Sequence, residues 1–452
     1  MNINEIVGRL KAGGLDASST NRGAAVYVTE VRSGRAEPGW FGFRIICNSE
    51  ATERRVRSIL SRWYDIDANG NVWRLKSKNR VPLMAIKRGG VPPTPPTPTG
   101  DYMYFEAAQA NSTVSMMSTL ATAPDLEYST DGETWQVWQH TTAEGTHTFD
   151  TLTLTNIGDR VYLRGENPNG FLDIQNVAFS LFSMTGKIAA HGNAQSLVDG
   201  DTPTLVAKTM PMFSDMAAIG EPNDVLVSAP SLPATTLAER CYNGMFSGCT
   251  GLTQAPSLPA TTLAEGCYYA MFSDCTGLTN APSLPATTLA ERCYSVMFGD
   301  CTGLTQTPSL PATTLAEHCY NGMFSGCTGL TQAPSLPATT LAEECYTSMF
   351  YGCTGLTQAP SLPATTLAEG CYYAMFSNCT GLTNAPSLPA TTLAERCYSV
   401  MFGDCTFAMS NDGTTFNFAF GATPPVTVGE ETYNTYYDIA QWMGNTNGFT
   451  TP

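Results

Sequence analysis

The chain has 452 residues, too many for one ordinary hydrophobic core, so two to four domains are expected. Charged residues are only 14% of the sequence, and its 40 glycines and 29 prolines argue against long surface helices and for strands, turns and repeats. The net charge of −16 is unevenly distributed: residues 1–90 are basic, with 16 Lys and Arg against 8 Asp and Glu, and the rest of the chain is acidic, with 7 Lys and Arg against 31 Asp and Glu. This contrast indicates that the two parts have different partners.

The first residues, MNINEIVGRLKAGGL, contain no unbroken apolar segment of the kind found in secretory signals, and no cysteine near them suggests a lipid anchor. No run in the chain approaches the ~18 apolar residues that a membrane helix needs. We therefore expect a chain that is neither exported by the usual route nor embedded in a membrane.

Residues 1–90 predict a small α+β domain. A short amphipathic helix (3–11) comes first, followed by strands in AAVYVTEV and WFGFRIIC, a helix over 51–63 and a hairpin over about 63–87. In that hairpin DIDANG resembles the start of a calcium loop, but Lys76 stands where the loop needs a bidentate Glu. The Asn-Gly pair in DIDANG is also a strong two-residue turn, which we favour.

The helix over 51–63 carries Arg54, Arg55, Arg57 and Arg62, which are candidate anchoring residues. They could contact nucleic acid or an acidic protein surface, or they could form a plain solvated face. VPPTPPTPTG (91–100) then predicts an extended proline-rich linker that separates this domain from the rest of the chain.

Residues 101–195 predict an antiparallel β-sandwich. Segments such as YMYFEA, TWQVWQ and HTFDTLTL alternate apolar and polar positions, and Asp131-Gly132 predicts a hairpin turn between two such runs. Trp135 and Trp138 lie an odd number of residues apart and should point to opposite faces of their strand. One of them could be exposed and stack on a sugar, or both could pack across strands.

Residues 196–406 are organised by a 26-residue repeat. Its first cysteine recurs from Cys241 to Cys397 and its second from Cys249 to Cys405, always at steps of 26. A fixed period of this length predicts a solenoid, in which each coil packs only on its neighbours. MFSDM (212–216) is a degenerate copy that should cap one end. The tail, 407–452, is expected to close the other end.

One coil is expected to contain a short helix, because TLAE at 236–239 has the pattern of a capping box. Leu237, Cys241 and Met245 would then share one buried face. LTQAPSLP should run extended on the opposite side, where Pro256 and its equivalents keep any parallel ladder short. With neighbouring coils about 4.8 Å apart, eight coils would span roughly 40 Å.

The phrase LPATTLAERCYNGMFSGCTGLT resembles the BspA-like leucine-rich repeats of Bacteroides-type surface proteins, in which a buried apolar position, an aromatic residue and an SGC step recur. The resemblance covers about residues 200–406. The preceding segment, with EYSTDGETWQVWQ and VYLRGENPNGF, resembles the β-sandwich that often precedes such repeats. The resemblance implies a multidomain, mainly β chain that ends in a leucine-rich-repeat solenoid, and it does not extend to residues 1–90.

Fourteen of the 15 cysteines lie in the repeats. The pattern disfavours a metal site, because the array contains one histidine, His318, and no C-x-x-C pair. A disulfide within one coil would have to span roughly 12 Å if the helix ran that far, and seven stacked cysteines cannot all pair within one ladder. We expect two ladders of buried, reduced thiols, and neither metal nor cofactor.

The copies differ from one another at several positions, three of which lie one residue before, two after and six after the first cysteine. On the expected helix these positions share the face opposite the buried stripe. This variable face could bind a ligand, or it could reflect weak constraint on solvated residues. Its candidate ligand-binding residues are Arg240, Asn243, Tyr269, Arg292, His318, Asn321, Glu344, Thr347, Tyr351, Tyr373 and Arg396.

Two copies, 267–292 and 371–396, differ only at Asp274 and Asn378. They are four coils apart, so a block of 104 residues has been duplicated as a unit. The number of coils is therefore expected to be adjustable.

The sequence contains no recognisable catalytic constellation: its four histidines lie in unrelated contexts, and it has no phosphate-binding glycine loop or nucleophile elbow. We therefore expect a non-enzymatic protein. The resemblance implies a surface adhesin, which needs export, whereas a phage virion protein is released by lysis. The favoured interpretation is a head or tail appendage, fibre or decoration, of a phage that infects Bacteroides-like bacteria.

In that interpretation residues 1–90 dock on other virion proteins, and residues 101–452 bind a bacterial surface or mucosal glycan ligand at the virion surface. The protein is expected in several copies, as a homo-oligomer or within an assembly. Neither nucleic acid nor a membrane is an expected partner. The alternatives are a bacterial cell-surface adhesin of the BspA-like type and a structural decoration protein without a ligand.

Overall fold

The fold is described from a computed structural model, and the described residues are mainly β, as predicted. The chain divides into two compact units, 1–97 and 98–452, and the division falls inside the predicted linker. Among the residues that the structure describes, no helix is long and apolar enough to cross a bilayer. The described residues are 7, 10–12, 15–18, 26–31, 42–47, 56, 64–66, 71–74, 84–87, 101–173, 175–201, 206–207, 213, 224–407, 425–428 and 430–444.

Unit 1–97 contains a six-stranded mixed sheet. In spatial order its strands are β1 (Ala17–Ser18), β2 (Val26–Val31), β3 (Gly42–Cys47), β6 (Met84–Lys87), β5 (Asn71–Arg74) and β4 (Tyr64–Ile66). The predicted strands and the β4–β5 hairpin are confirmed. The parallel pairing of β3 with β6 is an additional feature, which carries the hairpin onto the edge of the first strands.

The two predicted helices of this unit are described only in part. Val7 and residues 10–12 are helical, as is Val56, whose side chain is fully buried. The remaining positions of both helices lie outside the described residues, and so do Arg54, Arg55, Arg57 and Arg62 and the Asn-Gly turn.

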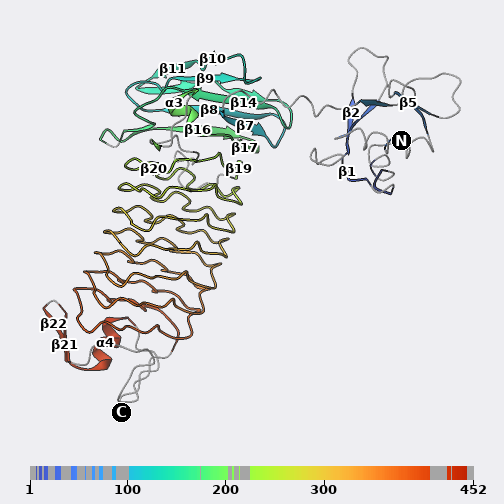
Figure 1. Cartoon of the computed structure of the whole chain (residues 1–452). Coiled ribbons are helices and arrows are strands. Elements are labelled where there is room, and N and C mark those ends of the chain that lie inside the picture. The colour runs from blue at the N-terminus through green and yellow to red at the C-terminus, as the bar shows by residue number, and fades with distance from the viewer. Residues whose placement is uncertain are drawn as a thin grey trace. The chain divides into compact units, whose positions relative to one another are not determined.

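Unit 98–452 begins with two facing sheets, which form the upper part of this unit in Figure 1. The first has the order β10 (Gln136–Val137), β9 (Leu126–Ser129), β14 (Arg160–Gly165), β7 (Met103–Ala107), β17 (Ile188–His191) and β19 (Leu226–Ser228). The second has the order β11 (His140–Ala143), β12 (Thr146–Phe149), β8 (Ser112–Ser118), β16 (Ala178–Thr185) and β15 (Leu172–Asp173), with β13 (Leu152–Leu154) also on β8.

Alternation of buried and partly exposed residues along β7 and β8 places one side of each sheet in a shared core. Phe105 of the first sheet meets Phe182 of the second at 5.0 Å between ring centroids. The predicted turn at Asp131 joins the antiparallel strands β9 and β10. The Asp131 carboxylate accepts hydrogen bonds from the N–H groups of Thr134 and Glu133, which hold the pKa of Asp131 well below its usual value.

Short elements connect the sandwich to the repeats. Helix α3 (Ser196–Asp199) places the Ser196 hydroxyl where it accepts from the Met103 N–H (2.9 Å) and donates to the Leu163 carbonyl (3.1 Å). Strand β18 (Val206–Ala207) pairs in parallel with β20 (Thr236–Leu237), and β19 extends the first sheet.

The repeats, residues 224–407, form a stack of coils that extends from the sandwich, which we call the coil stack (Figure 1). Equivalent residues in successive coils form parallel single bridges, as between Gln254 and Asn280 and between Thr288 and Thr314. No continuous strand forms in the proline-containing segments of residues 251–407, as predicted from Pro256 and its equivalents.

The helix predicted in each coil is wrong, because residues 239–248 and their equivalents form a ribbon of consecutive turns. Gly244 and Phe246 donate their N–H groups to the carbonyls of Tyr269 and Met271 in the next coil at 2.8 and 2.9 Å, whereas Met245 and Ser247 donate within their own coil. Backbone donors that would serve a helix therefore join neighbouring coils.

Left-handed backbone conformations at three positions per coil fix this ribbon. In one coil the positions are His318, Gly322 and Gly326, with φ of 53°, 59° and 72°. The third position is Gly, Asp or Asn in every copy, the residue types that adopt positive φ most readily. Although the helix is absent, the stripe predicted on it is buried, with Cys241 and Met245 fully enclosed.

Two aromatic columns run through the coil stack. The first consists of stacked phenylalanines from Phe246 to Phe402, and the second of stacked tyrosines from Tyr242 to Tyr398. Ring centroids in both columns lie 5.6 to 5.9 Å apart, wider than the predicted 4.8 Å spacing. We attribute the difference to the packing of turn ribbons and large rings in place of a continuous β-ladder.

Both ends of the coil stack are covered. Phe213, from the degenerate copy, stacks on Phe246 at 5.2 Å and donates its N–H to the Met245 carbonyl, as each repeat phenylalanine does to the next coil. Phe213 also contacts Phe182 of the sandwich, so one hydrophobic core runs through both parts.

At the other end, β21 (Val426–Val428) pairs with β22 (Glu431–Tyr433), and a capping box between Thr435 and Asp438 starts helix α4 (Tyr436–Trp442). Val400 and Phe402 donate their N–H groups to the carbonyls of Trp442 and Met443. The helix end therefore receives hydrogen bonds that a further coil would otherwise receive.

Candidate functional site

The variable face of the coil stack is the most distinctive surface of unit 98–452. Its residues lie on the turn ribbon, so each row contains equivalent positions of successive coils. Tyr269 and Tyr351 are 37% and 42% exposed, large values for aromatic side chains. Arg292 and Arg396 are also exposed, whereas Arg240, Asn243, His318, Asn321, Glu344 and Tyr373 are half-buried.

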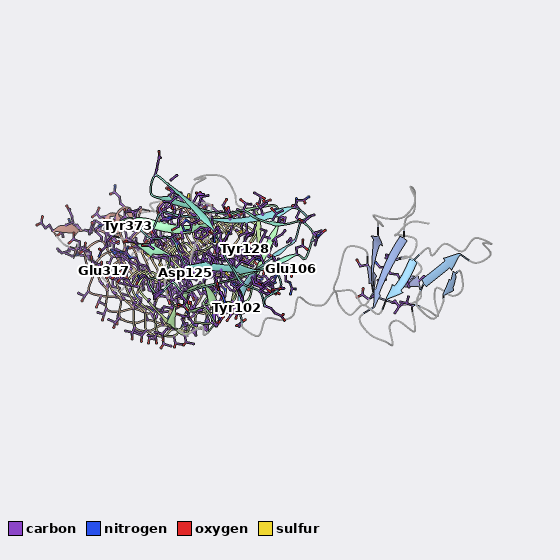
Figure 2. The ribbon with its side chains drawn as sticks, turned by 90° about the horizontal axis from the view of Figure 1, so that it is seen from above. Tyr102, Glu106, Asp125, Tyr128, Glu317 and Tyr373 are labelled. Atoms are coloured by element: carbon purple, nitrogen blue, oxygen red, sulfur yellow. The ribbon has the colours of Figure 1, made fainter. Side chains whose placement is uncertain are left out.

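Local contacts orient several of these side chains. Arg292 pairs with Glu291 at 3.0 Å, and His318 lies 3.2 Å from Glu317 and 3.3 Å from Glu344. The Arg396 guanidinium lies over the Tyr373 ring, 4.7 Å from its centroid. The variable face therefore combines exposed aromatic rings with charged groups that are already held in place. Figure 2 labels Glu317 and Tyr373 on this part of the molecule.

Thr347 does not belong to the accessible surface, which corrects its assignment as a candidate ligand-binding residue. Its side chain is buried, and its hydroxyl donates to the Gly370 carbonyl at 2.7 Å. The hydroxyl is therefore used to join two coils.

A row of glutamates beside the variable face was missed in the sequence, where it was interpreted as part of a capping box. One glutamate of each coil lies directly before the first variable position, and the row comprises Glu239, Glu265, Glu291, Glu317, Glu343, Glu369 and Glu395. Coils with Gly266 and Gly370 at the neighbouring position offer no cationic side chain there. The surface is therefore acidic along the coil stack.

The sandwich tryptophans occupy different environments. Trp138 is 1% exposed, packs on Phe149 and donates its Nε1–H to the Asp150 carbonyl at 2.8 Å. It cannot stack on a sugar, which corrects that assignment. Trp135 precedes β10 and is half-buried, with the Arg164 guanidinium 4.2 Å from its ring and the edge of Tyr102 at 4.7 Å.

Arg164 is the centre of a polar network beside Trp135. It pairs with Glu127 and Asp201, each at 2.7 Å, and the Tyr102 hydroxyl donates to Asp201 at 2.6 Å. The hydrogen bond from Tyr102, together with Arg164, lowers the pKa of Asp201. An open pocket of about 270 Å³ borders this network, and Figure 2 labels Tyr102 and Asp125 there. Because Arg164 is already paired with two carboxylates, we infer that the network chiefly orders the surface around Trp135.

The fourteen repeat cysteines are all buried, as predicted for the two ladders. Members of the second ladder donate to a phenylalanine carbonyl of the preceding coil, as Cys275 does to Phe246 at 3.0 Å. Burial raises the pKa of Cys249 and of Cys301 to about 12. These thiols therefore have little nucleophilic character. In the described ranges no group of three or more His, Cys, Asp or Glu side chains is placed to hold a metal ion.

Comparison of the chain with protein-family models, with curated protein sequences and with solved structures finds no match.

Proposed function

We propose that this chain is a non-enzymatic appendage of a phage virion, in which unit 1–97 docks on the particle and unit 98–452 displays the coil stack to a ligand. The observation that carries the proposal is the contrast between frame and surface. The buried positions around Cys241, Tyr242, Met245 and Phe246 are the same in every coil, whereas the side chains of the variable face change from coil to coil. Such a scaffold suits recognition, because substitutions on its surface leave the core intact.

We assign the coil stack to the leucine-rich repeats, of the BspA-like type. Supporting this assignment, each coil buries leucines at constant positions, such as Leu252 and Leu258, and stacks in register on its neighbours. The terminal coils are covered, as expected for a soluble repeat array.

The ligand we propose is a glycan of the bacterial surface or of mucus. Exposed tyrosines such as Tyr269 offer apolar ring faces for the C–H faces of sugars, and neighbouring groups such as Arg292 can bond sugar hydroxyls. The opposite charge balance of the two units supports different partners for each.

The location is tested by immunogold electron microscopy with an antibody to unit 98–452, applied to intact cells and to purified phage particles of one culture. Label on the particles supports the virion appendage. Label confined to cell envelopes would overturn it in favour of an adhesin.

The recognition role is tested with Tyr269→Ser and Tyr373→Ser in the full chain. Serine occupies the equivalent position at Ser295 and Ser399, so the fold accommodates the substitutions. We expect the double variant to lose most of its binding to bacterial cells or mucin. Unchanged binding would leave a structural decoration protein as the better explanation.

A further inference from the structure

A pocket of about 340 Å³ lies between the last coil and the C-terminal cap, and the proposed function does not use it. The coil contributes Glu395 and Arg396, β21 and β22 contribute Val428, Glu431 and Tyr433, and Glu430 and Trp442 complete the lining. Its volume is within the range of small-molecule sites.

The aromatic wall of this pocket is held firmly. The rings of Tyr433 and Trp442 stack at 5.1 Å with 28° between their planes, and Trp442 contacts the edge of Tyr398, the last ring of the tyrosine column. The hydrogen bond from Val400 to the Trp442 carbonyl fixes the backbone at the same point. The wall is thus ordered before a ligand arrives.

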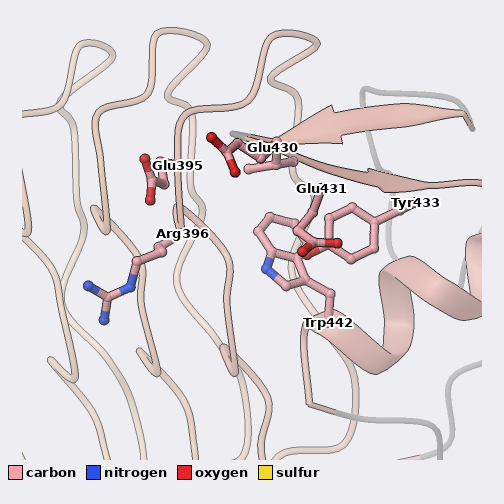
Figure 3. Close-up of a pocket in the computed structure, with 7 residues that line it drawn as sticks. Glu395, Arg396, Glu430, Glu431, Tyr433 and Trp442 are labelled. Atoms are coloured by element: carbon pink, nitrogen blue, oxygen red, sulfur yellow. The ribbon is translucent and has the colours of Figure 1, made fainter.

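Three carboxylates surround that wall without a cationic partner among the described residues. Glu395, Glu430 and Glu431 are exposed and form no ion pair within 4.0 Å with a described side chain. Figure 3 shows Glu430 directed toward Glu395, and Arg396 directed the other way. Arg396 lines the pocket, but its guanidinium lies over the ring of Tyr373, which is not part of the lining, so this charge is not placed between the carboxylates.

We propose that this pocket binds an alkylammonium group. The aromatic faces attract a cation through their quadrupoles, with Trp the strongest, and the three carboxylates attract it by charge. Burial, together with the neighbouring Glu431 carboxylate, raises the pKa of Tyr433, consistent with a negative field at the wall. The same carboxylates are not arranged to hold a metal ion in the described part of the chain, which favours an organic cation. A free quaternary amine and a lysine side chain share this chemistry.

The test is saturation-transfer NMR and calorimetric titration of the full chain with choline chloride and, separately, with Nα-acetyl-lysine methylamide, at constant ionic strength. We expect saturable binding of at least one probe. Combining E430Q with E431Q should lower the affinity about tenfold, because each charged contact that is lost weakens binding of a cation. Binding of choline alone identifies a free or headgroup amine as the ligand, and preferential binding of the lysine probe identifies a protein partner.

The matched control combines E317Q with E343Q, which removes the same charge from the coil stack away from the pocket lining. We expect these substitutions to leave binding unchanged. Trp442→Leu should abolish binding but also removes the contact with Tyr398, so the two pocket glutamates decide the outcome. Failure of both probes to bind, or equal losses of binding in the control, would overturn the proposal. None of these results affects the particle-labelling test.

Discussion

Three tyrosine hydroxyls in the coil stack are buried without a hydrogen-bond partner in the described part of the chain: those of Tyr242, Tyr294 and Tyr346. They belong to alternate coils, and the ring of each stacks on the tyrosine of a neighbouring coil at 5.6 to 5.8 Å. Because a buried polar group without a partner loses its hydration and gains nothing in return, each hydroxyl should destabilise the fold.

Tyr294→Phe removes such a hydroxyl and keeps the ring in its column. The missing hydrogen bond corresponds to about 1 to 3 kcal/mol, so the free energy of unfolding should rise by about this amount. Since Tyr242, Tyr294 and Tyr346 are separated by intervening coils, a triple Tyr→Phe variant should show roughly the sum of the single effects.

The assay is guanidinium unfolding of wild type and variants, with the change taken from the transition midpoint at an unchanged slope. Tyr320→Phe is the control, because the Tyr320 hydroxyl is not among the buried polar atoms without a partner. It should raise the midpoint by less than Tyr294→Phe does. A midpoint that falls in Tyr294→Phe would refute the reasoning, since the hydroxyl would then contribute a favourable hydrogen bond, for example to an internal water.

Four further predictions concern the turns, the cap and the thiols. Gly248→Ala should lower the free energy of unfolding by about 1 kcal/mol, because φ is positive there although no neighbouring atom is near the added Cβ. Gly326→Ala should lower it further, because its Cβ would meet the Asp300 carboxylate. Chemical unfolding compares the two variants, and equal losses of stability would contradict the clash. Met443→Asp places a charge in the buried contact between α4 and the last coil, so the last coil should become exposed. The variant should then associate as its concentration rises in sedimentation velocity, and a variant that stays monomeric would contradict this role of the cap. A thiol reagent at neutral pH should modify at most one of the 15 cysteines before denaturation, because fourteen are buried. Burial raises thiol pKa values, such as that of Cys249 from 9.0 to about 12, so the thiols of the unfolded chain lose their protons at lower pH than those of the folded chain. The stability that is present below pH 9 should therefore fall as the pH rises toward 12. A free energy of unfolding that does not change over this pH range would contradict the prediction.

The sequence predicted features of the coil stack that depend on the repeat itself. An invariant apolar position at a period of 26 must meet its own copy in the next coil, so burial of Cys241, Met245 and their equivalents follows from periodicity alone. The degenerate copy MFSDM was predicted to cap one end, and the structure shows its Phe213 stacked on Phe246 of the first full coil.

The predicted helix failed because TLAE was interpreted as a local signal. Capping preferences describe a chain whose N–H groups must find acceptors nearby, whereas here Gly244 and Phe246 find theirs in the next coil. The Gly, Asp and Asn residues equivalent to Gly248 indicated positive φ, but their spacing alone did not define a turn ribbon.

The candidate sites were less predictable than the frame. Alternation placed Trp135 and Trp138 on opposite faces, but the position of β10, which begins after Trp135, had to be known before either could be assigned. The pocket beside Trp442 joins residues from the last coil, a hairpin and a helix, and no repeat period relates them.

The hydrogen bonds that join neighbouring coils also determine how the molecule would respond to tension. They lie in series between the sandwich and α4, so a pull on the two ends of unit 98–452 puts the same force on every interface, and the coils should detach one after another. Each coil that detaches releases 26 residues, about 90 Å of extended chain. Force–extension traces should therefore contain steps of that length. A tether built this way would lengthen under load while the coils that have not detached stay folded and keep their binding surface.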